Sequence, residues 1–334
     1  MTTVTVMAEP EIDRMASNSS LTGRSIEPNG EMNAGQLMHL LRARFGDQVR
    51  ANVPLAPLTS ARIGGPADIL VNATSSEILA EAVSVLWQQG QDWTVLGGGS
   101  NVLVGDKGIR GVTILNRAKA VRFHDGPPGS VWAESGVVFS NLANRCAAKG
   151  FSGLEWAATV PGTIGGAVYG NAGAFGSDTA HCLSWADLVT RSGGERRSAD
   201  SLGYGYRTSV LKRHELQAVV LAAVLRLEAA TEAAVRARMA EFGERRKSTQ
   251  PPGASMGSMF KNPPGDKAGR LIESAGLKGK RLGSVEVSNV HANFFVNHGR
   301  ATAADVQALI QLVQGDVRSK LGVELELEIE LVGE

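Results

Sequence analysis

Glycines gather in clusters along this chain, and each cluster adjoins an apolar segment. The clusters among the 40 glycines are Gly64-Gly65, Gly97-Gly98-Gly99 and Gly162 to Gly176. The apolar run Trp93 to Leu96 predicts a short buried strand that leads into the second cluster. Because glycine leaves backbone N–H groups unobstructed, such a turn can cradle a phosphate. The alternative for each cluster in isolation is a turn that binds nothing.

The remaining apolar pattern mixes helical and strand periods, which predicts an α+β fold. Residues 52–116 read as strand, helix, strand, glycine cluster and strand, with the helix over 76–90. A helix begins at Thr302, with Asp305 in the capping-box position. The alternating run 323–331 predicts a strand with one apolar and one carboxylate face. Further strands are expected at 130–134, 185–190, 218–227 and 292–297, and helices at 141–147, 230–246 and 268–275.

Composition narrows the classes of function. The formal net charge of +1 gives no overall field that would draw the protein onto nucleic acid or an anionic membrane. Two cysteines are too few for a disulfide framework, and the histidines show no metal-ligand spacing. No apolar run approaches the ~18 residues of a membrane span. We expect a cytoplasmic monomer without metal, nucleic-acid or membrane partners, in which residues 1–35 form a disordered leader.

The segment Gly257 to Pro263 places a hydroxyl, a cation and a carboxamide close together. Ser258, Lys261 and Asn262 carry these groups. Pro263 excludes a helix here, because proline ends helices and restricts the residue before it. The local residues favour a turn, but they also offer one proton donor and two groups that can hold an anion.

The third glycine cluster contains Gly162, Thr163, Gly165 and Gly166 and continues to Asn171 and Ala172. Neither this cluster nor Gly97 to Asn101 matches the dinucleotide GxGxxG or a P-loop. Two glycine-rich segments in one region favour one elongated ligand that the backbone approaches closely. A flat cofactor with a diphosphate fits this description.

Six motifs occur in the order typical of one enzyme family. They are Thr59 to Ala67, Leu96 to Leu103, Val160 to Gly173, Tyr206 to Ser209, Gly257 to Pro263, and Val287-Ser288 with His291 to Phe294. Together they resemble the UDP-N-acetylenolpyruvoylglucosamine reductases, flavoenzymes of peptidoglycan synthesis. The resemblance covers about residues 40–333, and although each motif is weak alone, six in order are highly specific.

The resemblance implies a vanillyl-alcohol-oxidase-type FAD-binding domain of two α+β lobes and a smaller α+β lobe that covers the substrate. Residues 36–116 and 117–229 would form the two cofactor lobes, and 230–334 the substrate-binding domain. The segment 225–258 is short and lacks an extra tyrosine-bearing loop. This is similar to the subtype without the substrate-closing insertion.

The resemblance also implies the reaction, in which NADPH reduces UDP-N-acetyl-enolpyruvoylglucosamine to UDP-N-acetylmuramate through bound FAD. The preference for NADPH over NADH comes from the family alone. Arg207 would stabilise the enolate that develops on the substrate, because its planar fork suits a carboxylate. Ser258 would protonate the adjacent carbon, and Glu328 would be the catalytic carboxylate. Glu326 is the alternative, since the family usually carries arginine where Glu330 stands.

The implied binding residues fall into two groups. Those for FAD are Arg62, Gly97, Gly98, Gly99, Ser100, Asn101, Gly162, Thr163, Gly165, Gly166, Asn171 and Ala172. Those for the UDP-sugar are Tyr206, Lys247, Lys261 and Asn262. His291 and Asn293 would either line the pocket or hold a strand edge. Two other functions stay open at this point: an FAD oxidase that uses O₂, and a non-catalytic nucleotide-binding module.

Overall fold

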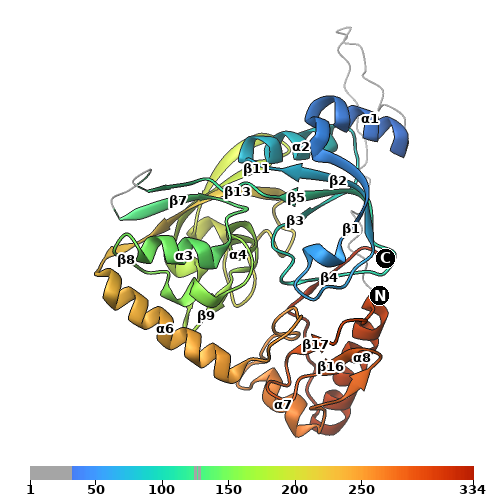
Figure 1. Ribbon diagram of the computed structural model, residues 1–334, viewed down its shortest axis with the longest axis vertical. Helices are drawn as coiled ribbons and strands as arrows, with labels where there is room; N and C mark the ends of the chain where they lie inside the picture. The colour runs from blue at the N-terminus through green and yellow to red at the C-terminus, as the bar shows by residue number, and fades with distance from the viewer. Residues whose placement is uncertain (1–31, 124–125, 127–128) are drawn as a thin grey trace, which may run out of the picture.

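The computed structural model describes residues 32–123, 126 and 129–334. Two sheets lie side by side, and a smaller lobe of helices and short strands lies below them (Figure 1). The α+β fold that the sequence predicts is therefore confirmed. Most of the predicted leader lies outside the described residues, and its last two residues, Ala34 and Gly35, begin helix α1.

The first lobe is built on a four-stranded sheet in the order β1-β2-β5-β3. Its elements are α1 (Ala34–Phe45), η1 (Gly46–Gln48), β1 (Val49–Pro54), η2 (Ala56–Leu58), β2 (Pro66–Ala73), α2 (Ser76–Gln88), β3 (Trp93–Leu96) and β5 (Ile109–Asn116). Helix α2 starts where the Ser75 side chain accepts from the N–H of Ile78. Strands β3 and β5 are parallel neighbours, so both carboxyl ends open at one edge of the sheet, the usual place for a ligand in such sheets.

The second lobe is built on a five-stranded antiparallel sheet in the order β12-β11-β13-β7-β6. Its strands are β6 (Val121–Phe123), β7 (Ser130–Glu134), β11 (Leu183–Thr190), β12 (Gly193–Ser198) and β13 (Ala218–Arg226). Its helices are α3 (Phe139–Ala147), η3 (Glu155–Thr159), α4 (Ile164–Gly170), α5 (Thr179–Cys182) and η4 (Asp200–Leu202). Two short pairs complete it: β8 (Phe151–Ser152) with β14 (Glu228–Ala229), and β9 (Gly173–Ala174) with β10 (Ser177–Asp178).

A buried carboxylate joins the two cofactor lobes. The Oε1 of Glu134, in β7, accepts from both the N–H and the hydroxyl of Ser76 at 2.7 Å. Its other oxygen accepts from the N–H of Ala120 at 2.6 Å. The start of α2 is thereby fixed to the second sheet, and both oxygens of the buried carboxylate are hydrogen-bonded.

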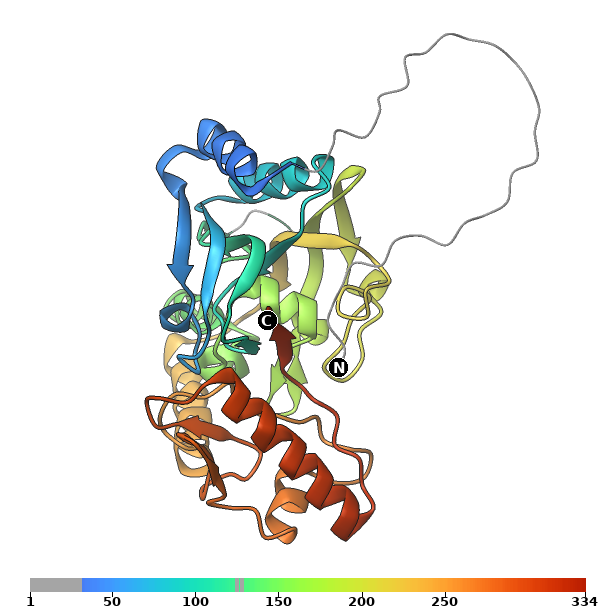
Figure 2. The ribbon, with the colours of Figure 1, turned by 90° about the vertical axis from the view of Figure 1, so that its right-hand side faces the viewer.

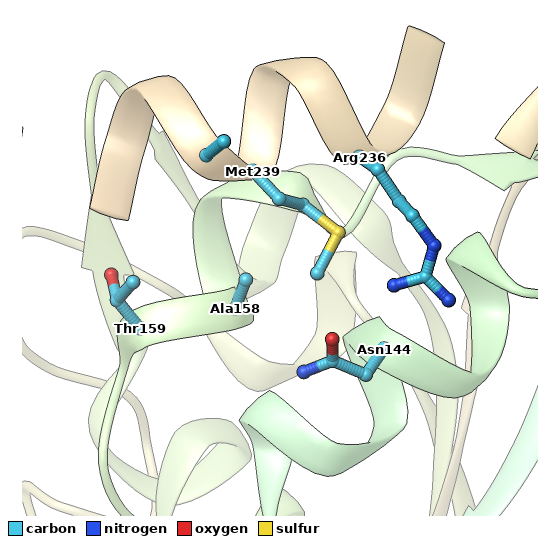
Figure 3. A pocket seen from close by; sticks show the side chains of 6 residues that line it. Asn144, Ala158, Thr159, Arg236 and Met239 are labelled. Atoms are coloured by element: carbon cyan, nitrogen blue, oxygen red, sulfur yellow. The ribbon is translucent and has the colours of Figure 1, made fainter. Parts of the chain in front are cut away.

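Helix α6 (Glu232–Thr249) packs on the second lobe, although its residues fall in the range 230–334 that we assigned to the substrate lobe. Its Val235 and Met239 form a cluster with Ala147 of α3. A cavity of about 250 Å³ lies between α3, η3 and α6 (Figure 3). Asn144, Thr159 and Arg236 lie on its wall, and none of the predicted site residues does.

The third lobe is built around two helices and a small antiparallel sheet, and its core also includes Ala61, Ile63 and Leu103 of the first lobe. Its elements are α7 (Ala268–Ser274), β15 (Arg281–Leu282), β16 (Val285–Val287), β17 (Phe295–Asn297) and α8 (Ala303–Leu321). The predicted capping box at Thr302 and Asp305 is confirmed, since both reciprocal hydrogen bonds form.

The chain then returns to the first lobe. Strand β18 (Glu330–Val332) leaves the third lobe and pairs in parallel with β4 (Val102–Val104). Figure 2 shows this dark red strand rising from the lower lobe into the body of the molecule. Because β4 directly follows Gly97 to Asn101, the pairing brings the end of the third lobe to the glycine cluster.

Two sequence predictions were wrong in detail. The predicted strand over 323–331 pairs continuously only at 330–332, because the preceding residues cross between lobes; there Leu327 forms a single bridge with Phe260. The predicted alternation of apolar and acidic residues still appears as an alternation in burial. Leu325 and Ile329 are buried, and Glu324 is exposed. In addition, Gly165 and Gly166 lie in helix α4 and not in a loop.

Candidate active site

The two glycine segments contact each other through their backbones. A Cβ added to Gly98 would lie 3.0 Å from the Cα of Gly162, and one added to Gly97 would lie 2.6 Å from the Oγ1 of Thr163. A Cβ added to Gly162 would lie 2.7 Å from the Oγ of Ser100. Larger residues would push the segments apart, so glycine is required where the two lobes meet.

Four consecutive backbone amides in the first segment are available to a ligand. Within the described residues, the N–H groups of Gly98, Gly99, Ser100 and Asn101 donate to no acceptor. Two carbonyls of the same turn are occupied, since Gly99 accepts from the Ser60 N–H and Asn101 accepts from the Glu330 N–H, both at 2.9 Å. Successive amides of this kind form an anion-binding concavity, so these residues fit the diphosphate of FAD.

Arg117 lies beside this turn and was missed in the sequence. It follows β5, and its Nη1 donates to the Gly97 carbonyl at 2.9 Å. Among the described residues it has no carboxylate partner, and burial lowers its pKa. The sequence does show that Arg117 directly follows a predicted strand. That this position adjoins Gly97 becomes clear from the pairing of β3 with β5 in the structure. An unpaired guanidinium here suits an anion.

The other predicted FAD-binding residues differ in whether their side chains face open space or bond to the protein. Gly166 faces open space, because an added Cβ would meet only the Thr163 Oγ1 at 3.9 Å. Asn171 is buried in a left-handed conformation and uses its amide on the protein, at the Gly205 carbonyl and the Ala180 N–H. The Ala172 carbonyl accepts from Thr179. The side chain of Arg62 is exposed, and the structure gives it no partner among the described residues.

The candidate catalytic arginine lies on a tight turn. Gly205 and Thr208 exchange backbone hydrogen bonds around Tyr206 and Arg207. Arg207 has φ +57, a left-handed conformation that costs a non-glycine residue free energy. Its Nε donates to the Oε1 of Glu328 at 2.8 Å, and its Nη2 donates to the Gly173 carbonyl at 2.8 Å. The remaining N–H groups of Arg207 have no partner among the described residues. The guanidinium is therefore held in place and can still donate hydrogen bonds to a ligand.

Backbone hydrogen bonds place Glu328 between the first glycine segment and the Ser258 segment. The Glu328 N–H donates to the Met259 carbonyl at 2.9 Å, and the side-chain Nδ2 of Asn101 donates to the Glu328 carbonyl at 3.0 Å. Ser258 directly precedes Met259, and its hydroxyl has no hydrogen-bond partner among the described residues. The structure therefore gathers the three predicted catalytic residues and leaves one hydroxyl available.

The two alternative glutamates differ in their surroundings. The side chain of Glu328 is 15% exposed and is paired with Arg207, whereas that of Glu326 is 73% exposed and is paired with Lys261. A second cation, Lys212, was missed in the sequence: its Nζ donates to the Glu328 carbonyl at 3.2 Å and pairs with Glu330 at 2.9 Å. These contacts favour Glu328 over Glu326 as the site carboxylate.

Of the predicted substrate residues, Tyr206 and Asn262 lie together. The Asn262 amide donates to the Tyr206 hydroxyl at 3.2 Å, and the tyrosine is 53% exposed. The Lys247 side chain lies on the exposed side of α6 and pairs with Glu244 at 2.7 Å. Its neighbour Arg246 is partly buried, which lowers its pKa, and no acid faces it among the described residues.

Asn293 has the structural role that we considered as one alternative. Its side-chain oxygen accepts from the Phe260 N–H at 3.0 Å, and its amide donates to the Phe260 carbonyl at 2.8 Å. His291 accepts from the Asn293 N–H at 3.2 Å, and burial lowers its pKa. Asn293 therefore holds the segment that carries Ser258 and Lys261, and His291 supports Asn293.

Comparisons with known proteins decide the family. The FAD binding domain family matches residues 67–199, and the C-terminal domain family of UDP-N-acetylenolpyruvoylglucosamine reductase matches residues 248–332. A UDP-N-acetylenolpyruvoylglucosamine reductase of Rubrobacter xylanophilus is 46% identical over 303 residues, which span 91% of this chain and 100% of that protein. The chain belongs to the UDP-N-acetylenolpyruvoylglucosamine reductase family.

Other members of this reductase family agree in sequence and structure. A UDP-N-acetylenolpyruvoylglucosamine reductase of Bacillus subtilis is 41% identical over 88% of this chain and 97% of its own length. The crystal structure of the reductase from Thermus caldophilus matches with a TM-score of 0.73 and 34% identity, over 85% of this chain and 99% of that one. The FAD-binding fold of two lobes, with a third lobe after it, is thus confirmed.

Two further properties concern the described residues of this reductase family member. No helix among them is both long and apolar enough to cross a lipid bilayer. In the same part of the chain, no three His, Cys, Asp or Glu side chains gather as metal ligands would.

Proposed function

We propose that this chain reduces UDP-N-acetylenolpyruvoylglucosamine to UDP-N-acetylmuramate in peptidoglycan synthesis, with NADPH as the reductant. The observation that supports the site is the Arg207–Glu328 pair, assembled between the free amides of Gly98 to Asn101 and the free hydroxyl of Ser258. When bound, FAD supplies the hydride that is added to the enolpyruvyl double bond. The residues of the chain supply charge, position and a proton.

The diphosphate of FAD fits the first glycine segment. Four backbone N–H groups of this segment donate to no acceptor among the described residues: those of Gly98, Gly99, Ser100 and Asn101. Arg117 adds a cation at the start of the same turn. Gly162 and Thr163 close the other side of the segment, and Gly166 leaves space beside α4. Together these groups can hold an elongated anionic cofactor where the lobes meet.

Arg207 stabilises the negative charge that develops on the substrate carboxylate. Its Nε and Nη2 are fixed by Glu328 and the Gly173 carbonyl, so its remaining donors are aimed before substrate arrives. A cation that is positioned in advance stabilises the transition state more than the ground state. Glu328 orients this guanidinium and keeps it from pairing elsewhere.

Ser258 donates the proton that completes the reduction. Its hydroxyl is uncommitted in the described structure, and it precedes the Met259 carbonyl that holds Glu328. A serine is a weak acid in water, so it needs cations and amides nearby that stabilise its alkoxide. Lys261 and Asn262 follow it on the same segment and would supply these contacts on leaving Glu326 and Tyr206, their partners in this structure. Tyr206 and Asn262 also form a polar edge for the UDP-sugar.

An anaerobic titration tests this function. NADPH should bleach the visible absorbance of the bound flavin, and the enolpyruvyl sugar nucleotide should then restore it with one equivalent of lactyl product. Hydrogen peroxide production in air, without recovery by the sugar nucleotide, would instead indicate an oxidase. A purified protein that holds no flavin would refute the enzyme assignment.

We also propose that the enzyme works as a monomer in the cytoplasm. Both cysteines are free and buried, which suits a reducing compartment. Sedimentation equilibrium would measure the oligomeric state, and a mass twice the 35.1 kDa of the chain would contradict the monomer.

A further inference from the structure

We propose that Phe175, a residue outside the site described above, positions Arg207 for the second half of the reaction. It does so by anchoring the β9–β10 hairpin to helix α6. The inference rests on the proposed function, because it assigns Arg207 to the reduction of the sugar nucleotide. Four observations lead to it: a strained turn, an aromatic stack, a shared carbonyl and a second hydrogen-bonded route to the same turn.

The β9–β10 hairpin turns through Phe175 and Gly176. Ala174 faces Ser177 and Gly173 faces Asp178 in the antiparallel ladder, and the two turn residues have φ of +54 and +85. A two-residue turn with both φ positive normally carries asparagine or glycine at its first position. A phenylalanine there is strained, and such strain persists only when the surrounding structure compensates for it.

An aromatic stack compensates for it. The rings of Phe175 and Phe242 are 4.5 Å apart at their centroids, with 11° between their planes. Arg245 lies over Phe175 at 5.8 Å, and Arg238 lies over Phe242 at 5.6 Å. Phe242, Arg238 and Arg245 are all on α6, so the hairpin tip is held between aromatic and cationic groups of one helix.

The base of the same hairpin holds the catalytic arginine. Gly173 begins β9, and its carbonyl accepts from the Nη2 of Arg207 at 2.8 Å. Among the described residues, the Glu328 carboxylate is the other hydrogen-bond partner of this guanidinium, at Nε. The position of the Gly173 carbonyl therefore sets the plane of the guanidinium.

A second route connects the hairpin to the arginine turn. Asp178, at the end of the ladder, accepts from the Asn171 amide at 3.2 Å, and the same amide donates to the Gly205 carbonyl at 3.0 Å. Gly205 begins the turn that holds Arg207 in its left-handed conformation. Both routes start in the hairpin and end at Arg207, so release of the tip from α6 would loosen both.

The experiment measures the two half-reactions of the FAD-loaded enzyme separately by stopped flow. In Phe175→Leu we expect flavin reduction by NADPH to stay at the wild-type rate. Reoxidation by the sugar nucleotide should slow by about tenfold or more, because small misplacements of a catalytic group are costly in rate. Phe242→Leu should reproduce this selective effect without touching the strained turn, and Phe175→Tyr should restore the rate because the ring remains.

The chain offers a matched control. Phe123 and Phe151 form another stacked pair, with 11° between their planes, and Lys149 lies over Phe123 at 4.9 Å. Phe123 lies on β6 and Phe151 on β8, whereas the Arg207 side chain donates to Gly173 and Glu328. Phe123→Leu should leave both half-reactions unchanged at equal melting temperature.

A double variant separates positioning from general stability. If Phe175 acts through Arg207, then Phe175→Leu should add no further loss in an Arg207→Lys background. The inference is overturned if the losses multiply, if both half-reactions slow equally, or if Phe123→Leu behaves like Phe175→Leu. Wild-type enzyme that is not reoxidised by the sugar nucleotide would instead refute the proposed function itself.

Discussion

Arg207 and Glu328 form an ion pair at 2.8 Å although 121 positions separate them in the chain. Both side chains are largely shielded, with 25% and 15% exposure. The pair joins the second cofactor lobe to the segment that leaves the third lobe. A shielded pair with good geometry is sensitive to the loss of one partner, because the other charge is left uncompensated.

Glu328→Gln should therefore reduce turnover by orders of magnitude, whereas Glu326→Gln should stay within a few-fold of wild type. Glu326 is largely exposed and pairs with Lys261, and exposed pairs contribute only about 0–1 kcal/mol. Steady-state kinetics of both variants measure the difference. Equal losses in the two variants would remove the distinction between the two carboxylates.

Arg207→Lys should lower the rate of flavin reoxidation by about 10²–10³-fold, the usual effect of losing a positioned donor to developing charge. Lysine keeps the charge but cannot contact Glu328 and the Gly173 carbonyl with one planar fork. NADPH should still reduce the flavin. Stopped-flow absorbance resolves the two steps, and a loss confined to NADPH oxidation would contradict the assigned role.

Ser258→Ala should keep bound FAD and normal reduction by NADPH but slow reoxidation by about 10²–10⁴-fold, the range for a lost general acid. Ser255→Ala, three positions earlier on the same segment, is the matched control and should behave like wild type. Rapid reoxidation of the Ser258→Ala enzyme would exclude Ser258 as the proton donor.

Arg117→Met should weaken FAD binding. Hydrogen bonds to charged groups contribute about 1.5–3 kcal/mol, which corresponds to about 10–100-fold in affinity. Arg110→Met is the control, because Arg110 pairs with Asp68 at 2.8 Å away from the glycine turn. Titration of apoprotein with FAD, followed by quenching of flavin fluorescence, gives both dissociation constants. Equal affinities of the two variants for FAD would mean that Arg117 hydrogen-bonds the Gly97 carbonyl without contacting the cofactor.

The two cysteines should be unreactive in the folded protein. Burial raises the pKa of the Cys146 and Cys182 thiols to about 12, and only the thiolate reacts readily. Unfolded thiols ionise near their ordinary value of 9.0, so the stability that the neutral thiols confer should decline as the pH rises from 9 toward 12. Iodoacetamide labelling at pH 8, with and without denaturant, measures the protection; fast labelling of folded protein would disprove it.

Local signals predicted the regular elements well. Apolar spacing gave α2, and the reciprocal pair Thr302 and Asp305 gave the start of α8. Helix α4 was missed because Gly165 and Gly166 lower helix propensity, while the contact of Gly165 with Ser135 requires so small a residue. Tertiary packing thus overrode the local preference.

The sequence predicted those site residues that lie within one of the family's motifs. Ser258, Arg207 and the Gly97 turn follow from the resemblance, and the structure brings them together as three separate segments. Arg117 and Lys212 could not be found this way, because their significance depends on which strands are neighbours and on where the segment after α8 runs. Sequence spacing alone contains neither relationship.

The return of β18 to β4 means that the chain joins the third lobe to the cofactor lobes at two places and not at one, besides the contacts that Ala61, Ile63 and Leu103 make in its core. A body on one linker can rotate about any axis, whereas a body on two linkers swings mainly about the line between them. Glu328 lies two residues before β18, close to that line. If the third lobe closes over a substrate, the parts of the lobe farthest from that line would therefore move most. The Glu328 carboxylate would stay almost stationary.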